Sequence, residues 1–181
     1  TLAVALFAAL PASAAWSGAG KLIVGVGAGN AFALSDGRVV SVGIPSLINW
    51  WPPTTQIWSP STNKWTKSAS QPALPNVFLA VPALLNDGRI LVTGYCKSSC
   101  GSGSNTEIYD PATDSWSQPS QMNTGRYLHQ AVNLLDGRVI VMGGCSAYGC
   151  AADTASAEIF DPATGKWNAA TPMKAHRASF S

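Results

Sequence analysis

The chain has 181 residues, of which 46% are hydrophobic and only 11% are charged, and its formal net charge is +2. Disorder requires low hydrophobicity and high charge, so this composition excludes a disordered chain. The eleven Lys and Arg residues are scattered singly, so we expect no nucleic-acid partner. With 17 Gly, 12 Pro and 7 Trp residues, the sequence indicates a compact β protein with many turns.

The first segment is an apolar run from Leu2 to Leu10, followed by small residues of the Ala-x-Ala type. This pattern is typical of a secretory signal peptide, although a buried strand or helix start is the alternative. The run is shorter than the roughly 20 residues of a membrane-spanning helix, so we expect no transmembrane segment. We predict a signal-peptide remnant at 1–14, a linker or first strand at 15–28, and a secreted, extracellular or periplasmic protein.

Two motifs recur along the rest of the chain with a nearly constant period. One is an Asp-Gly-Arg sequence between apolar residues, at Asp36-Gly37, Asp87-Gly88 and Asp136-Gly137. The other is a Pro-containing turn that ends in a Trp, at Trp65, Trp116 and Trp167. The Trp residues are 51 residues apart, and the Asp-Gly pairs are 51 and 49 residues apart. Two independent motifs with one period indicate a structural repeat.

Each repeat predicts four short antiparallel strands. Asp-Gly between apolar runs is a hairpin signal and predicts a type I′ turn, with positive φ at both turn residues. In the third repeat this turn joins strands at 131–135 and 138–142, whose nearly continuous apolar runs indicate burial on both faces. Asp-Pro-Ala-Thr predicts a second turn between a third strand at 158–160 and an edge strand from Lys166 onward. Four short strands per period of about 50 residues predict a propeller blade.

The order of these elements resembles the kelch motif, in which Asp-Gly-Arg, two aliphatic residues and Gly-Gly precede an aromatic-Asp-Pro turn and a closing Trp. The third repeat matches best, with Gly143-Gly144, Phe160 and Trp167. A Met-x-x-x-Arg element follows the second and third repeats, at 122–126 and 173–177, but not the first.

The resemblance covers residues 29–181 and implies an all-β, kelch-type β-propeller. It predicts three four-stranded blades, at about 29–79, 80–127 and 128–177, and the start of a fourth. Because propellers have about 4 to 8 blades, we expect a fragment of a larger ring, with closure by oligomerisation as the alternative.

Four cysteines form two close pairs in equivalent loops between second and third strands: Cys96 with Cys100, and Cys145 with Cys150. A four-thiolate metal site across neighbouring blades is one interpretation. Two local disulfides are favoured, because an exported protein meets an oxidising compartment and local pairs need no contact between blades. We therefore expect two disulfides and no metal.

The corresponding loop of the first repeat contains Trp50 and Trp51. Exposed aromatic residues can stack on sugar rings or anchor a protein partner, so these two are candidate binding residues. The alternative is that they pack over the neighbouring blade, since Trp is usually buried. His129 and His176 lack a catalytic partner in the sequence, so we expect no catalytic residue.

These observations predict a secreted, non-catalytic kelch scaffold that binds protein or carbohydrate through its rim loops and needs no cofactor. The alternative, implied by the resemblance, is the propeller portion of a galactose-oxidase-like copper-radical oxidase or another carbohydrate-active enzyme. Copper in those oxidases is held by Tyr and His, with a Cys crosslinked to a Tyr. No residue of this chain can be matched to that set.

Overall fold

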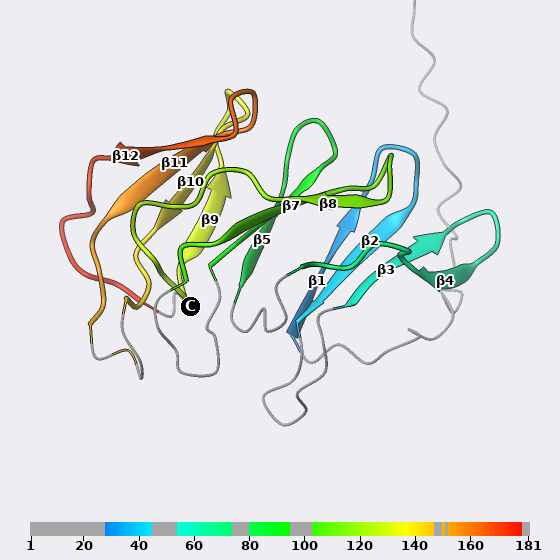
Figure 1. Ribbon diagram of the computed structural model, residues 1–181, viewed down its shortest axis with the longest axis horizontal. Helices are drawn as coiled ribbons and strands as arrows, with labels where there is room; N and C mark the ends of the chain where they lie inside the picture. The colour runs from blue at the N-terminus through cyan, green and yellow to red at the C-terminus, as the bar shows by residue number, and fades with distance from the viewer. Residues whose placement is uncertain are drawn as a thin grey trace, which may run out of the picture.

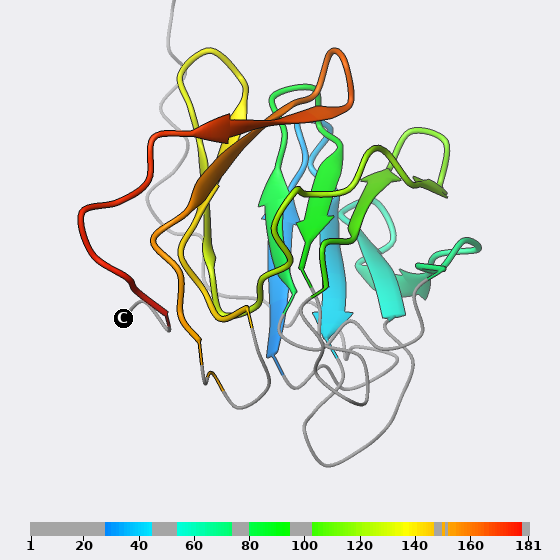
Figure 2. The same ribbon diagram turned by 60° about the vertical axis from the view of Figure 1, so that its left-hand side comes forward.

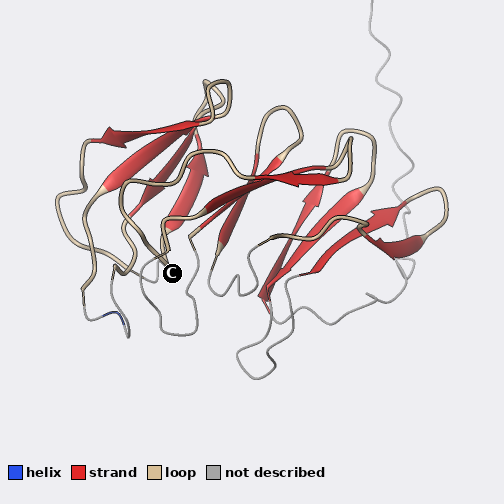
Figure 3. Cartoon of the chain, in the orientation of Figure 1, coloured by secondary structure: helices blue, strands red, loops and turns tan. Residues whose placement is uncertain are grey.

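The computed structural model describes residues 28–44, 54–73, 80–94, 103–146, 150 and 152–178. These residues form three antiparallel sheets of four strands, hydrogen-bonded in chain order within each sheet (Figure 1; Figure 3). The first sheet contains β1 (Ala28–Ala33), β2 (Val39–Ile44), β3 (Thr54–Ser59) and β4 (Lys64–Lys67). The second contains β5 (Val81–Leu84), β6 (Ile90–Thr93), β7 (Thr106–Asp110) and β8 (Ser115–Ser117). The third contains β9 (Gln130–Asn133), β10 (Val139–Met142), β11 (Ala157–Asp161) and β12 (Lys166–Ala170).

The predicted all-β fold with three four-stranded blades is confirmed. The sheets stand side by side in chain order, and the view in Figure 2 shows the same succession. Within each sheet the first-to-second and third-to-fourth turns lie at one end, here named the turn edge; it is at the top of Figure 1, except that the β3–β4 turn is at the right. The second-to-third connections leave from the opposite end, here named the loop edge.

The Asp-Gly turns differ from the predicted type I′ turns. Only the glycine has a positive φ, of 86° to 89°, while the preceding Asp does not. The Gly amide donates to the carbonyl of the Leu three residues earlier, at 3.0 Å in all three sheets. This is a three-residue hairpin loop that ends in a left-handed glycine. The type I′ prediction is wrong because the Asp carboxylate accepts the backbone N–H of the Arg two residues on, at 3.0–3.1 Å. This hydrogen bond forms a turn in which only the Gly needs the left-handed conformation.

Two apolar clusters fill the spaces between the sheets, as expected for blades that pack face to face. The cluster between the first and second sheets includes Val40 of β2, Val92 of β6 and Tyr109 of β7. The cluster between the second and third sheets contains Leu91, Ile108, Met122, Val139, Val141, Phe160 and Trp167. The motif Trp residues lie on the fourth strands, and two of them pack against the aromatic residue of the third strand. The ring centroids are 5.2 Å apart for Tyr109–Trp116 and 5.1 Å for Phe160–Trp167.

The third hairpin is buried on one face, so the prediction of burial on both faces is wrong there. Strand β6 is buried at every position, whereas β10 alternates between buried and half-buried residues. Val132 on β9 is 48% exposed. The second sheet has a neighbour on each side, but only one face of the third sheet is covered by another described sheet.

Candidate functional site

The candidate site lies at the loop edge of the third sheet, where the chain leaves β10. Cys145 and Cys150 form a disulfide, with their Cα atoms 4.9 Å apart. Tyr127 pairs with Cys145 as an isolated antiparallel bridge, through backbone hydrogen bonds of 3.1 and 2.8 Å. Its phenol oxygen also accepts the Cys150 N–H at 2.8 Å. The buried Tyr127 and the disulfide together fix the base of this loop.

The returning half of the loop is also held by backbone hydrogen bonds. Thr154 donates its N–H to the Gly144 carbonyl at 2.9 Å, and Asp153 forms a bridge with Cys145. The His176 Nδ1 lies 3.0 Å from the Asp153 carbonyl oxygen and 3.4 Å from its carboxylate. Asp153, His176 and Arg177 are exposed. The loop edge therefore presents acidic and basic side chains on a well-braced backbone.

A buried ion pair lies beneath this loop. The Arg126 guanidinium is fully buried and lies 2.9 Å from Glu158, which is itself 3% exposed. The same guanidinium donates to the carbonyls of Gly143 at 3.0 Å and Ser156 at 2.9 Å. Glu158 also accepts the backbone N–H groups of Asn123 and Thr124, at 2.7 and 2.9 Å. Because a buried charge is tolerated only when paired and hydrogen-bonded, this network fixes the linker from the second sheet onto the third.

His129 joins the second and third sheets close to this network. Its Nε2 lies 2.8 Å from the Thr93 hydroxyl, and the residue is 3% exposed. Burial, assisted by the nearby Arg126 charge, lowers the pKa of His129 to about 3, so the imidazole is neutral at physiological pH. A Cβ on Gly94 would approach its Cε1 to 2.7 Å. His129 is thus enclosed between sheets and has a structural role.

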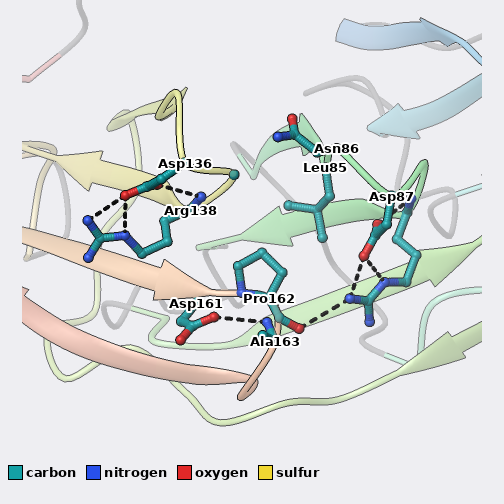
Figure 4. A pocket seen from close by; sticks show the side chains of 10 residues that line it. Leu85, Asn86, Asp87, Asp136, Arg138, Asp161, Pro162 and Ala163 are labelled. Atoms are coloured by element: carbon teal, nitrogen blue, oxygen red, sulfur yellow. Dashed lines mark hydrogen bonds and ion pairs between the residues drawn. The ribbon is translucent and has the colours of Figure 1, made fainter.

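A shallow pocket lies on the turn edge between the second and third sheets (Figure 4). Arg89 pairs with Asp87 at 2.7 Å and donates to the Pro162 carbonyl of the next sheet at 3.2 Å. Asp161 accepts the Ala163 N–H at 2.9 Å. The charged groups of Asp36, Asp87 and Asp136 are each bonded to the Arg two residues on, which lowers the pKa of all three carboxyls. These groups bond to one another or to nearby backbone, so the pocket is a junction between blades.

Several residues of interest lie outside the described part of the chain. Trp50, Trp51, Cys96 and Cys100 are among them, and their binding and disulfide roles stay predictions. Trp65 is half-buried on β4. The Arg126–Glu158 pair was not predicted from the sequence. Two sequence features could have indicated the pair. A Gln or Glu occupies the same position in each repeat, at 56, 107 and 158, and Arg126 is the last residue of the Met-x-x-x-Arg element.

Among the described residues, the Cys and Tyr side chains that the oxidase alternative would require are engaged in other contacts. Within those ranges, no group of three or more His, Cys, Asp or Glu side chains could hold a metal ion. Cys145 is in a disulfide, and Tyr109 donates its hydroxyl to Asp114 at 2.7 Å. None of the described ranges contains a helix that is long and apolar enough to cross a membrane.

Comparison with known proteins identifies the repeat. A family model of the kelch motif matches residues 126–174, which include all four strands of the third sheet. Residues 126–174 therefore carry a kelch motif, and the described sheets have a propeller-type fold. Over 62 residues the chain is 42% identical to Kelch-like protein 15 of Danio rerio, a match that covers 34% of the chain and 10% of that protein.

Two solved structures share the fold at low sequence identity. One is a fungal alcohol oxidase of the AA5 family in complex with copper, with a TM-score of 0.51 and 19% identity over 82% of this chain and 44% of the oxidase chain. The other is the protein YjhT, with a TM-score of 0.58 and 17% identity over 83% of this chain and 49% of its own. The chain thus spans less than half of either solved chain and a tenth of the curated relative. These similarities establish the fold.

Proposed function

We propose that this kelch-repeat chain is a secreted binding scaffold that holds a protein or carbohydrate ligand at its loop edge. The observation that carries the proposal is the braced loop between β10 and β11. Its base is held by the Cys145–Cys150 disulfide and by Tyr127, while Asp153, His176 and Arg177 face solvent. Loops on a rigid scaffold commonly carry binding residues, because a fixed backbone reduces the entropy lost on binding.

The turn edge and the described loop edge of the third sheet differ in how their charged side chains are paired. At the turn edge, the charged side chains of the Asp-Gly-Arg turns pair with one another. At the loop edge of the third sheet, the Arg177 guanidinium has no hydrogen-bond partner among the described residues. Trp50 and Trp51 fall in the loop of the first repeat that the sequence places at the same edge. Polar groups combined with aromatic residues suit glycan stacking or a protein hot spot.

Two features support secretion. A disulfide such as Cys145–Cys150 persists in oxidising compartments and is rare in the cytosol. The apolar segment from Leu2 to Leu10 has the pattern of a signal peptide. Expression with an intact export signal tests this directly: intact mass analysis of the exported protein is expected to show an N-terminus at Ala15 and four oxidised cysteines. A protein retained in the cytosol with free thiols would contradict secretion.

The binding role is tested with the full chain immobilised and probed with a glycan array and with a library of extracellular protein domains. For a captured ligand, Trp50→Ala and Trp51→Ala are expected to weaken binding by about 30-fold, the effect of losing an aromatic hot spot of roughly 2 kcal/mol. Asp153→Ala changes an exposed side chain in the described part of the loop edge and is also expected to weaken binding. Asn86→Ser is the matched control, because it changes an exposed turn-edge residue to the one at the same position of the first repeat, Ser35. Binding that responds to the control and not to the loop-edge variants would refute the proposal.

A further inference from the structure

The pocket between the second and third sheets is formed by three turns at the turn edge (Figure 4). Two are the β5–β6 and β9–β10 hairpin turns, and the third is the β11–β12 turn. The volume of the pocket is about 260 Å³. Small-molecule sites usually have volumes of about 300–1,000 Å³, so this pocket is better matched to one side chain of a protein partner than to a metabolite.

The charges in the pocket do not balance. Three carboxylates and two guanidinium groups line it, which gives a net charge of −1. The two arginines are bonded to the aspartates of their own hairpin turns, at 2.7 Å for Arg89–Asp87 and 2.6 Å for Arg138–Asp136. Asp161 is the remaining carboxylate, and it has no ion pair among the residues that the structure describes. The pocket is therefore complementary to a cationic group.

Asp161 is held in position by its own turn. Its Oδ1 accepts the Ala163 N–H at 2.9 Å, while its Oδ2 has no hydrogen-bond partner within the described ranges. The adjacent Pro162 is fixed as well, because its carbonyl accepts from Arg89 at 3.2 Å, and Figure 4 shows Pro162 between the two Asp–Arg pairs. A carboxylate next to an apolar ring suits lysine, whose methylene stem packs on apolar surface while its ammonium stays at the end.

A fully exposed leucine lies beside the pocket. Leu135 is 107% exposed and directly precedes Asp136 of the pocket lining. The corresponding positions of the first and second repeats are polar, Ser35 and Asn86. A single exposed leucine is common on protein surfaces and does not by itself indicate a partner. This one lies in the hairpin turn that forms one wall of the pocket, so one partner can contact both.

We propose that this part of the turn edge is an interaction surface for a protein that carries a lysine next to an apolar residue. The lysine ammonium pairs with the Asp161 Oδ2, its methylene stem lies on Pro162, and the apolar side chain covers Leu135. Charge complementarity selects the lysine, because a cation is what the unpaired carboxylate lacks. The surface lies at the opposite edge of the blades from the loop edge, so it can be occupied together with a loop-edge ligand.

The test presents the full chain to a bead library of random hexapeptides with acetylated and amidated ends. The wild type and the double variant Asp161→Asn/Leu135→Ser carry different dyes, and beads that bind only the wild type are sequenced. We expect these sequences to contain a lysine beside an apolar residue. The absence of such beads, or their sequences without lysine, would overturn the proposal.

The pairing of the lysine with Asp161 is then measured by a double-mutant cycle. Replacing the peptide lysine by norleucine, which lacks only the ammonium group, should weaken binding about five-fold, as loss of a surface ion pair does. Asp161→Asn should weaken it equally, because Asn can still accept the Ala163 N–H but carries no charge. The two losses should not add, since both remove the same ion pair, and additive losses would overturn the pairing.

Asp110→Asn is the matched control, with melting temperatures checking that each variant is folded. Asp110 occupies the same turn of the second sheet and accepts a backbone N–H at 2.8 Å, but the β5–β6 hairpin carries Asn86 where the third sheet has Leu135. This control should leave peptide affinity unchanged, whereas Leu135→Ser should lower it about ten-fold. Equal effects of Asp110→Asn and Asp161→Asn would indicate unspecific attraction of cations and overturn the assignment. Loss of peptide binding in Asp153→Ala would place the peptide at the loop edge and also overturn it.

Discussion

Replacing Glu158 by Gln should destabilise the third sheet more than its modest change in size suggests. Glu158 and Arg126 are 3% and 0% exposed and lie 2.9 Å apart. The variant keeps the shape of the side chain but leaves the Arg126 charge buried without a counter-ion. Breaking a buried pair from one side costs roughly 3–5 kcal/mol, because the remaining charge loses its compensation. With a urea m-value of about 2 kcal/mol/M, the unfolding midpoint should fall by about 2 M.

Glu107→Gln is the matched control for this experiment. Glu107 occupies the same repeat position in the second sheet, where it accepts the Ala73 N–H at 3.0 Å and the Gln118 side chain at 3.2 Å. The first repeat has no Met-x-x-x-Arg element to supply an arginine there, and the first sheet itself has Gln56 at this position. We therefore expect the control to lower the free energy of unfolding by only about 1–2 kcal/mol. Tryptophan fluorescence during urea unfolding measures both variants. If Glu158→Gln costs no more than Glu107→Gln, the buried ion pair does not stabilise the fold as argued.

Three further predictions concern the same region. Gly94→Ala should lower the free energy of unfolding in urea by more than roughly 3 kcal/mol, because its Cβ would lie 2.2 Å from the Arg126 carbonyl oxygen. Gly88→Ala should lower it by about 1 kcal/mol, since only the Gly88 φ of 87° opposes the substitution. Equal losses would contradict the close approach. His129 has a folded pKa of about 3 against 6.5 unfolded, so its contribution to stability is full above pH 6.5 and falls as the pH drops toward 3. The stability difference between the wild type and His129→Gln should therefore shrink between pH 7 and pH 4, and parallel curves would exclude this linkage. The double variant Cys145→Ser/Cys150→Ser should lose roughly 2 kcal/mol, the entropy expected for a loop with a sequence separation of 5, and an unchanged melting temperature would indicate that hydrogen bonds alone hold the loop.

The strands and their order could be predicted from the sequence because the signals that define them are local and repeated. Asp-Gly-Arg and Asp-Pro turns mark where each hairpin reverses, and the 51-residue spacing of Trp65, Trp116 and Trp167 makes the blades equivalent. The type of the Asp-Gly turn could not be predicted from that dipeptide alone. Its geometry depends on a hydrogen bond between the Asp carboxylate and the Arg amide, which the type I′ interpretation did not include.

The buried network at the candidate site lay beyond sequence reasoning for a different reason. Arg126 and Glu158 are 32 residues apart, and nothing local distinguishes this Arg from the exposed Arg177 in the same motif. Their difference arises only when a following sheet supplies the glutamate. His129 is a similar case, because its neutral state depends on enclosure between two sheets near Thr93. Burial of polar groups is a tertiary property, so the repeat could indicate the position of these residues but not their state.

The Arg126 guanidinium also explains how the candidate site can vary without loss of the fold. It bonds the carbonyls of Gly143 and Ser156, which flank the β10–β11 loop on its two sides. The two ends of the loop are therefore held together by hydrogen bonds to Arg126, a residue of the preceding linker. The disulfide is a second link between them, nearer the tip of the loop. Because both ends are fixed independently of the intervening side chains, the exposed side chains of Ala152 and Asp153 can change with little cost in stability. A loop with this support is suited to ligand recognition. Removing the Arg126 hydrogen bonds should increase the mobility of the β10–β11 loop before the sheets separate.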